Sequence, residues 1–150
     1  MTNAYQVYTA SRQLLEAYAA AMQPLCRRVH MASTAVDILL YLANNPGRDT
    51  ARDICTYRGL KPGLVSFHVE RLVQEGYLQR CSDPGDRRRC HLLCTDLAAP
   101  LIEQGRAAQE DFFRRMTAGL APEELAVFHR CLDVFRENLT DIQIAEEEQE

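Results

Sequence analysis

Hydrophobic residues recur every three or four positions through most of this chain, which is the spacing of one stripe on a helix. The first such stripe predicts a long helix over residues 3–29. Pro24 falls inside it, and because the stripe continues beyond Pro24 we expect a kinked helix rather than a helix end. The stripe consists of Tyr8, Leu15, Tyr18, Met22, Leu25 and Val29.

A second helix is predicted to start at Ser33 or Thr34, with Asp37 completing a short capping box. The turn residues NNPG end this helix. Its core face is expected at Ile38, Leu39 and Leu42.

Two short helices then follow with a glycine-containing turn between them. Thr50 is expected to cap the first, whose inner face would be Ile54 and Cys55, and Gly59 is expected to end it. Pro62 suits the first turn of the second helix, and Gly76 its end. This order matches a helix-turn-helix motif. The buried face of its second helix is predicted at Val65, His68, Val69 and Leu72, and the exposed face at Gly63, Leu64, Ser66, Phe67, Glu70 and Arg71.

The runs at 77–81 and 90–94 are short and β-prone, and the turn residues SDPGDRRR separate them. They predict a hairpin with a basic tip. The alternation of side chains places Cys90, Leu92 and Cys94 on one face, and His91 and Leu93 on the other.

Two further helices complete the chain. Thr95 is expected to cap the first, whose stripe would be Leu97, Leu101, Ala108, Phe112 and Met116, with Pro100 costing one hydrogen bond. The last begins at Pro122 and carries a stripe of Leu125, Phe128, Leu132, Phe135, Leu139 and Ile142.

The predicted fold class is mainly α with a small β-hairpin wing, formed by a winged helix-turn-helix over 34–94 and a helical dimerisation stem over 3–30 and 95–143. We expect a single unit over 1–150, with an acidic disordered tail at 145–150. The stem carries more apolar surface than so small a winged region can cover. A homodimer is therefore expected, with its two recognition helices in successive major grooves of double-stranded DNA.

The charge distribution favours DNA more than the formal net charge of −4 does. Residues 48–91 hold nine basic and six acidic side chains, whereas the last five residues hold four acids. Of the 17 basic residues 16 are arginine, which suits phosphate and guanine contacts.

The segments TARDICTYRGLKPGLVSFHVERLVQEGYLQR and DPGDRRRCHLLCT resemble the multiple-antibiotic-resistance regulator (MarR) family, and the likeness extends from about Tyr8 to Leu139. The resemblance implies a dimeric repressor that a small molecule or an oxidant releases from a pseudo-palindromic operator. It also implies that Asp86 holds Arg88 in position to enter the minor groove. The expected DNA-binding residues are Lys61, Gly63, Leu64, Ser66, Phe67, Arg71, Arg87, Arg88 and Arg89.

Phe67, Leu64 and Gly63 depart from the family pattern, which is usually polar, basic or hydroxylated at these places. Phe and Leu can still touch thymine methyl groups. They would also suit a winged helix that binds protein, which stays open as an alternative. His68 is expected to be a packed core histidine.

Other chemistries receive less support. Cys26 with His30 could form a metal sensor, and Cys81 facing Cys90 a redox switch, although most cysteines are expected to be reduced and to pack as small hydrophobes. Weak candidates for an effector site between wing and stem are Tyr8, Arg12, His30 and Met31.

The sequence shows no motif of a metal protease, a phosphate-binding loop or a nucleophile elbow, so we expect no enzyme activity, no metal and no cofactor. No apolar run is long enough to span a membrane and no leader is recognisable, so we expect a cytoplasmic protein.

Overall fold

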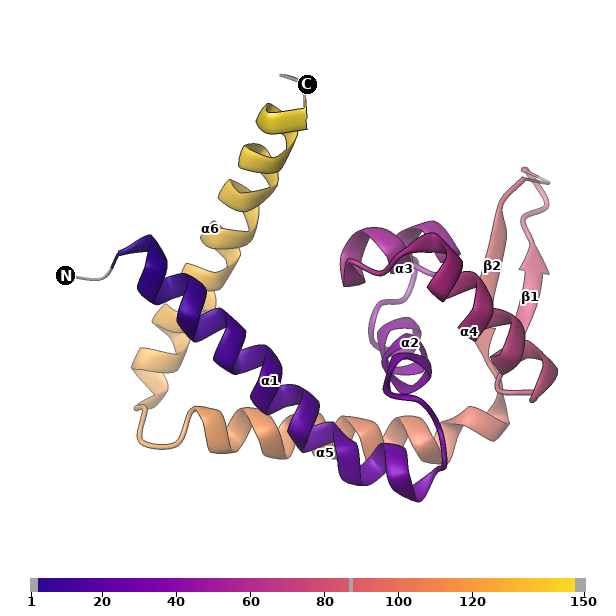
Figure 1. The fold of residues 1–150 in the computed structure, drawn as a ribbon, viewed down its shortest axis with the longest axis horizontal. Helices are drawn as coiled ribbons and strands as arrows, with labels where there is room; N and C mark the ends of the chain where they lie inside the picture. The colour runs from indigo at the N-terminus through magenta and orange to yellow at the C-terminus, as the bar shows by residue number, and fades with distance from the viewer. Residues whose placement is uncertain (1–2, 87, 148–150) are drawn as a thin grey trace. The chain divides into compact units, whose positions relative to one another are not determined.

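The structure is a computed structural model that describes residues 3–86 and 88–147. The predicted fold class is confirmed, because the described chain is mainly helical with one two-stranded antiparallel sheet (Figure 1). In chain order the elements are α1 (Ala4–Arg28), α2 (Ser33–Asn44), α3 (Ala51–Arg58), α4 (Pro62–Gln74), β1 (Leu78–Ser82), β2 (Cys90–Cys94), the 3-10 helix η1 (Asp96–Ala98), α5 (Ala99–Met116) and α6 (Pro122–Glu147).

The chain divides into two compact units, Met1–Phe112 and Phe113–Glu150, whereas a single unit was expected. The first unit contains α1 to β2 and most of α5. The second contains the end of α5 and all of α6. Each unit is described separately below.

Helix α1 starts at a capping box in which the Asn3 side chain accepts from the Gln6 N–H and the Gln6 side chain accepts from the Asn3 N–H. As predicted, α1 continues through Pro24, and it ends at Arg28. Its second half is buried at Met22, Leu25 and Cys26. The first half of the stripe remains exposed, with Tyr8 at 65% and Leu15 at 69%.

Helix α2 forms the centre of the first unit, and it is buried around most of its circumference. The predicted core residues Ile38, Leu39 and Leu42 are buried, as are Ala35, Val36, Leu40 and Tyr41. The predicted cap at Ser33 or Thr34 is wrong. The N-cap is Ala32, which makes no side-chain cap, and both Asp37 carboxylate oxygens accept from the Arg58 guanidinium at 2.6 and 2.9 Å.

Helices α3 and α4 follow the prediction closely. Thr50 caps α3 in a capping box with Asp53, and Gly59 ends α3 with a left-handed φ of 62°. Beyond α4, Gly76 adopts a φ of 85°, and the Tyr77 N–H reaches back to the Leu72 carbonyl. This is a Schellman ending, which satisfies carbonyls that the helix itself leaves open. The predicted inner face of α4 is buried at Val65, His68, Val69 and Leu72.

The hairpin pairs β1 and β2 in a register that aligns Leu78 with Cys94 and Cys81 with His91. Ser82 is the partner of Cys90. The prediction that Cys81 faces Cys90 is therefore wrong by one residue, which places their side chains on opposite faces of the hairpin. Leu92 is buried against the core, whereas Cys90 is exposed.

Helix α5 begins later than expected because residues Asp96–Ala98 form the 3-10 turn η1. Thr95 does not cap it, and its hydroxyl instead donates to the Gly76 carbonyl at 2.6 Å. Pro100 is consequently the second residue of α5, where its missing N–H costs no helical hydrogen bond. Leu97, predicted on the apolar stripe, is 56% exposed, while Leu101 and Ile102 are buried.

Helix α6 begins at Pro122 as predicted, where the Glu124 carboxylate accepts from the Ala121 N–H at 2.7 Å. Much of its apolar stripe is exposed: Leu132, Phe135, Leu139 and Ile142 range from 46% to 58%. The helix runs to Glu147, three residues into the expected acidic tail, and residues 148–150 lie outside the described residues.

Candidate nucleic-acid interface

The outer face of α4 is exposed and unusually apolar. Every residue predicted for that face is exposed, including Leu64 at 41% and Phe67 at 60%. The Phe67 ring meets the His68 ring edge-on at 5.1 Å between centroids. His68 is buried in the core as predicted, and burial, with a smaller effect from Arg71, lowers the pKa of its imidazole.

The charged side chains on α4 are held in ion pairs. Arg71 contacts Glu75 at 2.8 Å within the helix. Arg80 on β1 contacts Glu70 at 2.9 Å, and Gln74 donates to the same carboxylate. The Arg80 partnership lowers the pKa of Glu70. Both arginines are thus balanced by acids on the surface that would face a ligand.

The tip of the wing is ordered through Asp86. Its side chain accepts from the Arg88 backbone N–H at 2.9 Å, and its carbonyl accepts from the Arg89 N–H at 2.9 Å. Asp86 thus fixes the backbone at Arg88. Arg88 and Arg89 are exposed, and Arg87 lies outside the described residues.

Asp49 joins the base of the wing to the segment before α3. The Asp49 carbonyl accepts from the Leu92 N–H at 2.8 Å, and its carboxylate lies 2.6 Å from His91 Nδ1. His91 Nε2 lies 3.4 Å from Asp83 on the other side. Hydrogen bonds to Asp49 and then Asp83 raise the pKa of His91, because both carboxylates favour the imidazolium. The sequence reading of His91 missed this role, since Asp49 is 42 residues away.

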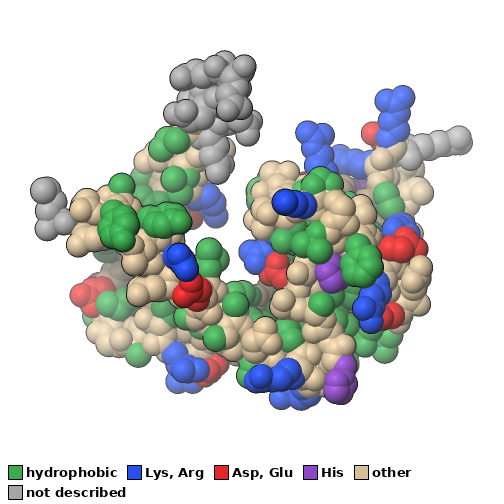
Figure 2. All heavy atoms as spheres, viewed as in Figure 1, with side chains coloured by type: hydrophobic (Ala, Val, Ile, Leu, Met, Phe, Trp, Pro, Cys, Tyr) green, Lys and Arg blue, Asp and Glu red, His purple; other side chains and the backbone are tan. Residues whose placement is uncertain are grey.

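Basic side chains also surround the start of α3. The Arg48 guanidinium lies over the Tyr57 ring, 4.3 Å from its centroid. The hydrogen bond from Thr50 lowers the pKa of Asp53 most, with smaller effects from Arg89 and Arg48. Because Arg48 and Arg89 both act on Asp53, the wing lies close to the start of α3. Lys and Arg side chains appear over this part of the molecule together with hydrophobic ones (Figure 2).

The four expected effector residues do not form one site. Tyr8 and Arg12 are exposed near the start of α1, where Arg12 pairs with Glu16. His30 and Met31 follow the opposite end of α1, about 30 Å along the helix. These two line a small pocket of about 50 Å³ with His68 and Arg71.

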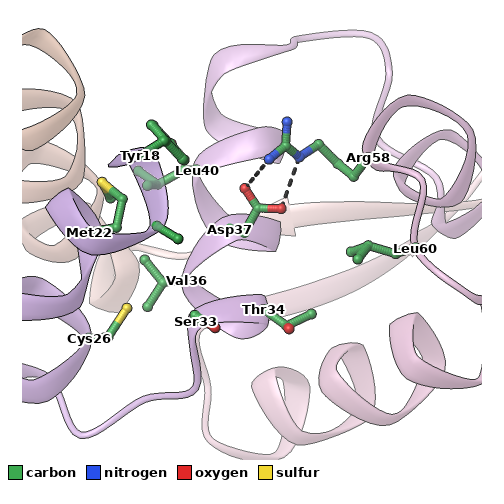
Figure 3. Close-up of a pocket in the computed structure, with 11 residues that line it drawn as sticks. Tyr18, Met22, Cys26, Ser33, Thr34, Val36, Asp37, Leu40, Arg58 and Leu60 are labelled. Carbon is green, nitrogen blue, oxygen red and sulfur yellow. Dashed lines mark hydrogen bonds and ion pairs between the residues drawn. The ribbon is translucent and has the colours of Figure 1, made fainter. Parts of the chain in front are cut away.

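A larger pocket of about 200 Å³ lies among α1, α2 and the end of α3 (Figure 3). Its wall is apolar at Met22, Val36 and Leu60, and the Asp37–Arg58 pair forms its charged side. Tyr18 contributes its ring, and its hydroxyl accepts from Gln109 at 2.7 Å. This cavity is a better candidate for an effector site than the four residues expected from the sequence. Its walls come from segments that are far apart in the sequence, so the sequence pattern does not predict it.

The proposed sensor pairs are not assembled. Cys26 is buried, where desolvation raises the pKa of its thiol, while His30 is exposed in a left-handed turn with φ of 52°. Within the described residues no group of three or more His, Cys, Asp and Glu side chains could hold a metal ion. No helix of the described chain is long and apolar enough to cross a bilayer.

Comparison with known proteins matches residues 31–89 to the model of the MarR family. This segment is a MarR-family winged helix-turn-helix. It spans α2 to the tip of the wing, so the resemblance expected from the sequence is confirmed where its motifs lie.

Relatives agree with the family match. The chain is 24% identical over 101 residues to the HTH-type transcriptional repressor IacR of Pseudomonas putida, covering 67% of this chain but only 60% of the length of that repressor. The fold is similar to a MarR transcriptional regulator from Methanosarcina mazei, with a TM-score of 0.77, 18% identity and coverage of 91% and 97% of the two chains. It is also similar to Bordetella bronchiseptica BpsR, with a TM-score of 0.67, 20% identity and coverage of 91% and 96%.

Proposed function

We propose that this protein is a dimeric transcriptional repressor that binds double-stranded DNA and leaves its operator when a small molecule binds. One observation carries the proposal: the MarR-family segment presents the outer face of α4 and the Asp86-ordered arginine wing as exposed surfaces of a single unit. In a winged helix-turn-helix these are the parts that meet the two grooves of DNA.

The docking follows from the geometry of B-DNA. The major groove admits a helix, so α4 enters it through the face that carries Lys61, Gly63, Leu64, Ser66, Phe67 and Arg71. The narrower minor groove concentrates negative potential, which attracts an arginine from the wing. Arg88 and Arg89 supply this contact, and Arg87 belongs to the same loop.

A second copy of the chain would cover the apolar residues left exposed in one copy. The large exposed side chains, between 46% and 76% exposed, include Tyr5, Tyr8 and Leu15 on α1 and Leu132, Phe135, Leu139 and Ile142 on α6. A two-fold dimer built on such helices would place two copies of α4 about 34 Å apart, one turn of DNA.

The effector site is proposed at the pocket lined by Tyr18, Met22, Asp37, Arg58 and Leu60. An apolar molecule with a carboxylate fits its chemistry, since the anion would compete with Asp37 for the Arg58 guanidinium. In BpsR, 6-hydroxynicotinic acid regulates DNA binding. That regulator's ligand is an organic acid, like the class of molecule proposed here.

The test is a binding measurement on DNA selected from a random pool. Replacing Arg88 by Ala should weaken binding by roughly 1–3 kcal/mol in fluorescence anisotropy and reduce the slope of log K against log salt by about one. Arg136→Ala on α6, whose guanidinium pairs with Asp133, is the matched control and should leave affinity unchanged. Equal affinities of the Arg88 variant and the parent protein would remove the wing from the mechanism.

A winged helix that binds protein is the second candidate, because Leu64 and Phe67 expose large apolar side chains on α4. The two candidates differ in salt dependence. DNA binding loses affinity steeply as salt rises because counterions are released, whereas an apolar protein contact does not. Failure to enrich any duplex from the random pool would favour the protein-binding function.

A further inference from the structure

We infer that α4 reads its operator chiefly through the 5-methyl groups of thymine, which Leu64 and Phe67 contact. The inference rests on the proposed DNA-binding function and names the chemical feature that the helix recognises. The reasons are the apolar exposure of α4, the pairing of its charges and the chemistry of the major groove.

Leu64 and Phe67 are three residues apart, so they lie next to each other on the helix surface. They are 41% and 60% exposed, although a soluble protein gains by hiding such side chains. Phe67 is also restrained, because its ring packs edge-on against the buried His68. A restrained ring loses little conformational freedom when it meets a ligand.

The long polar side chains of this face are already engaged. Arg71 is bound to Glu75, and Arg80 to Glu70. Surface pairs of this kind are weak and can open. Opening either one, however, would leave a carboxylate without its partner close to DNA phosphates, where like charges repel. The other polar side chains among the expected DNA contacts of this helix are Lys61, at the N-cap of α4, and Ser66.

The major-groove edge of each base pair presents hydrogen-bonding atoms, and thymine adds the only apolar group of the four standard bases. An apolar side chain therefore discriminates bases best by covering this methyl. Burying one methyl contributes about 0.8 kcal/mol, which corresponds to a roughly fourfold change in affinity. Operators selected by the protein should thus place thymines under α4, in both half-sites.

The experiment replaces thymine by deoxyuridine, which removes only the methyl group. Duplexes are first selected from a random pool with the full-length protein, and the major-groove positions of α4 are located by footprinting. Each thymine-to-deoxyuridine change at these positions should weaken binding roughly fourfold, and changes outside them should have no effect.

Protein variants assign the effect to the two side chains. In Phe67→Ala and Leu64→Ala, deoxyuridine and thymine duplexes should bind equally at the positions which that residue covers. Both side chains are substantially exposed, so neither change opens a core cavity. Leu120→Ala removes a side chain of similar exposure, 45%, from the segment before α6, and should keep full sensitivity to the methyl group.

Two results would overturn the inference while leaving the proposed function intact. One is a selected operator that binds equally well with deoxyuridine at every position under α4. The other is a methyl effect of the same size in the parent protein, Phe67→Ala and Leu64→Ala. A pool in which no duplex is enriched would overturn both the inference and the proposed function.

Discussion

Gly105 lies where α5 packs against α2, and only a residue without a Cβ fits there. A Cβ at this position would clash with Leu40 Cγ and both Leu40 methyl groups, because all three atoms would lie closer than van der Waals contact. Leu40 is 1% exposed, so a Cβ at this position would force a buried side chain to shift. The sequence showed a glycine within a helical stripe but not the leucine, 65 residues earlier, that makes it necessary.

Replacing Gly105 by Ala is therefore expected to destabilise the first unit by about 1–3 kcal/mol through overpacking. Urea unfolding followed by circular dichroism measures this change. Gly63→Ala is the matched control, because its Cβ would meet nothing within 4 Å and alanine favours a helix. The explanation fails if the Gly105 variant is as stable as the Gly63 variant.

The cysteines should differ sharply in reactivity. Cys90 is exposed on β2, whereas Cys26 is buried and burial raises the pKa of its thiol. Iodoacetamide at neutral pH is expected to modify Cys90 well before Cys26, since only the accessible thiolate reacts. Peptide mass spectrometry over a time course measures both rates. In urea the two rates should converge, and early modification of Cys26 in the folded protein would show that α1 opens.

At the level of secondary structure, the sequence correctly predicted the helix starts and ends that depend only on neighbouring residues. The cap at Thr50 and the glycine stops at Gly59 and Gly76 are local, and the structure has them. Predictions failed where a distant partner competes. Asp37 does not cap α2 because it binds Arg58, 21 residues later, and Thr95 instead donates to Gly76.

In the candidate site, too, local features were predicted and contacts between distant segments were not. Periodicity separated the buried and exposed faces of α4 correctly. The hairpin register, the Asp49–His91 contact and the pocket at Arg58 could not be predicted, because each depends on chain segments that meet only after folding. A shift of one residue in register exchanges the two faces of a strand, so patterns of alternation alone cannot place a cysteine pair.

The wing should be anchored less firmly at high pH. Contact with Asp49 and Asp83 raises the pKa of His91 above its ordinary value near 6.5. Its contribution to stability is therefore complete below about pH 6.5 and is lost as pH rises through the folded-state pKa. DNA affinity should decline over the same interval, because the hairpin carries Arg88.

An NMR titration of the His91 ring measures the folded-state pKa, and urea unfolding from about pH 6 to pH 9 measures the stability. In His91→Gln the part of the pH dependence due to this residue should disappear. Asp49→Asn should lower the His91 pKa while keeping the backbone bond from Leu92 to residue 49. A His91 pKa at or below 6.5 in the parent protein would contradict the prediction.

For the molecule as a whole, the exposed apolar stripe on α6 predicts that the protein self-associates. Leu132 and Phe135 are 46% and 54% exposed, at helical spacing. Replacing both by Asp should convert a dimer into a monomer, because burying two unpaired carboxylates at an interface is costly. Sedimentation velocity measures the change. Asp133→Asn on the same helix is a control that should stay dimeric, and an unchanged dimer in the double variant would exclude this stripe from the interface.

The backbone and side-chain bonds of Asp49 also bear on how a signal can travel. They fix the hairpin to the segment that begins α3, so the parts proposed to meet the two grooves move together. The distance between α4 and the tip of the wing is then fixed within one protomer. Under the proposed function, an effector would then release DNA by changing the separation between the two protomers of the dimer rather than by moving the wing.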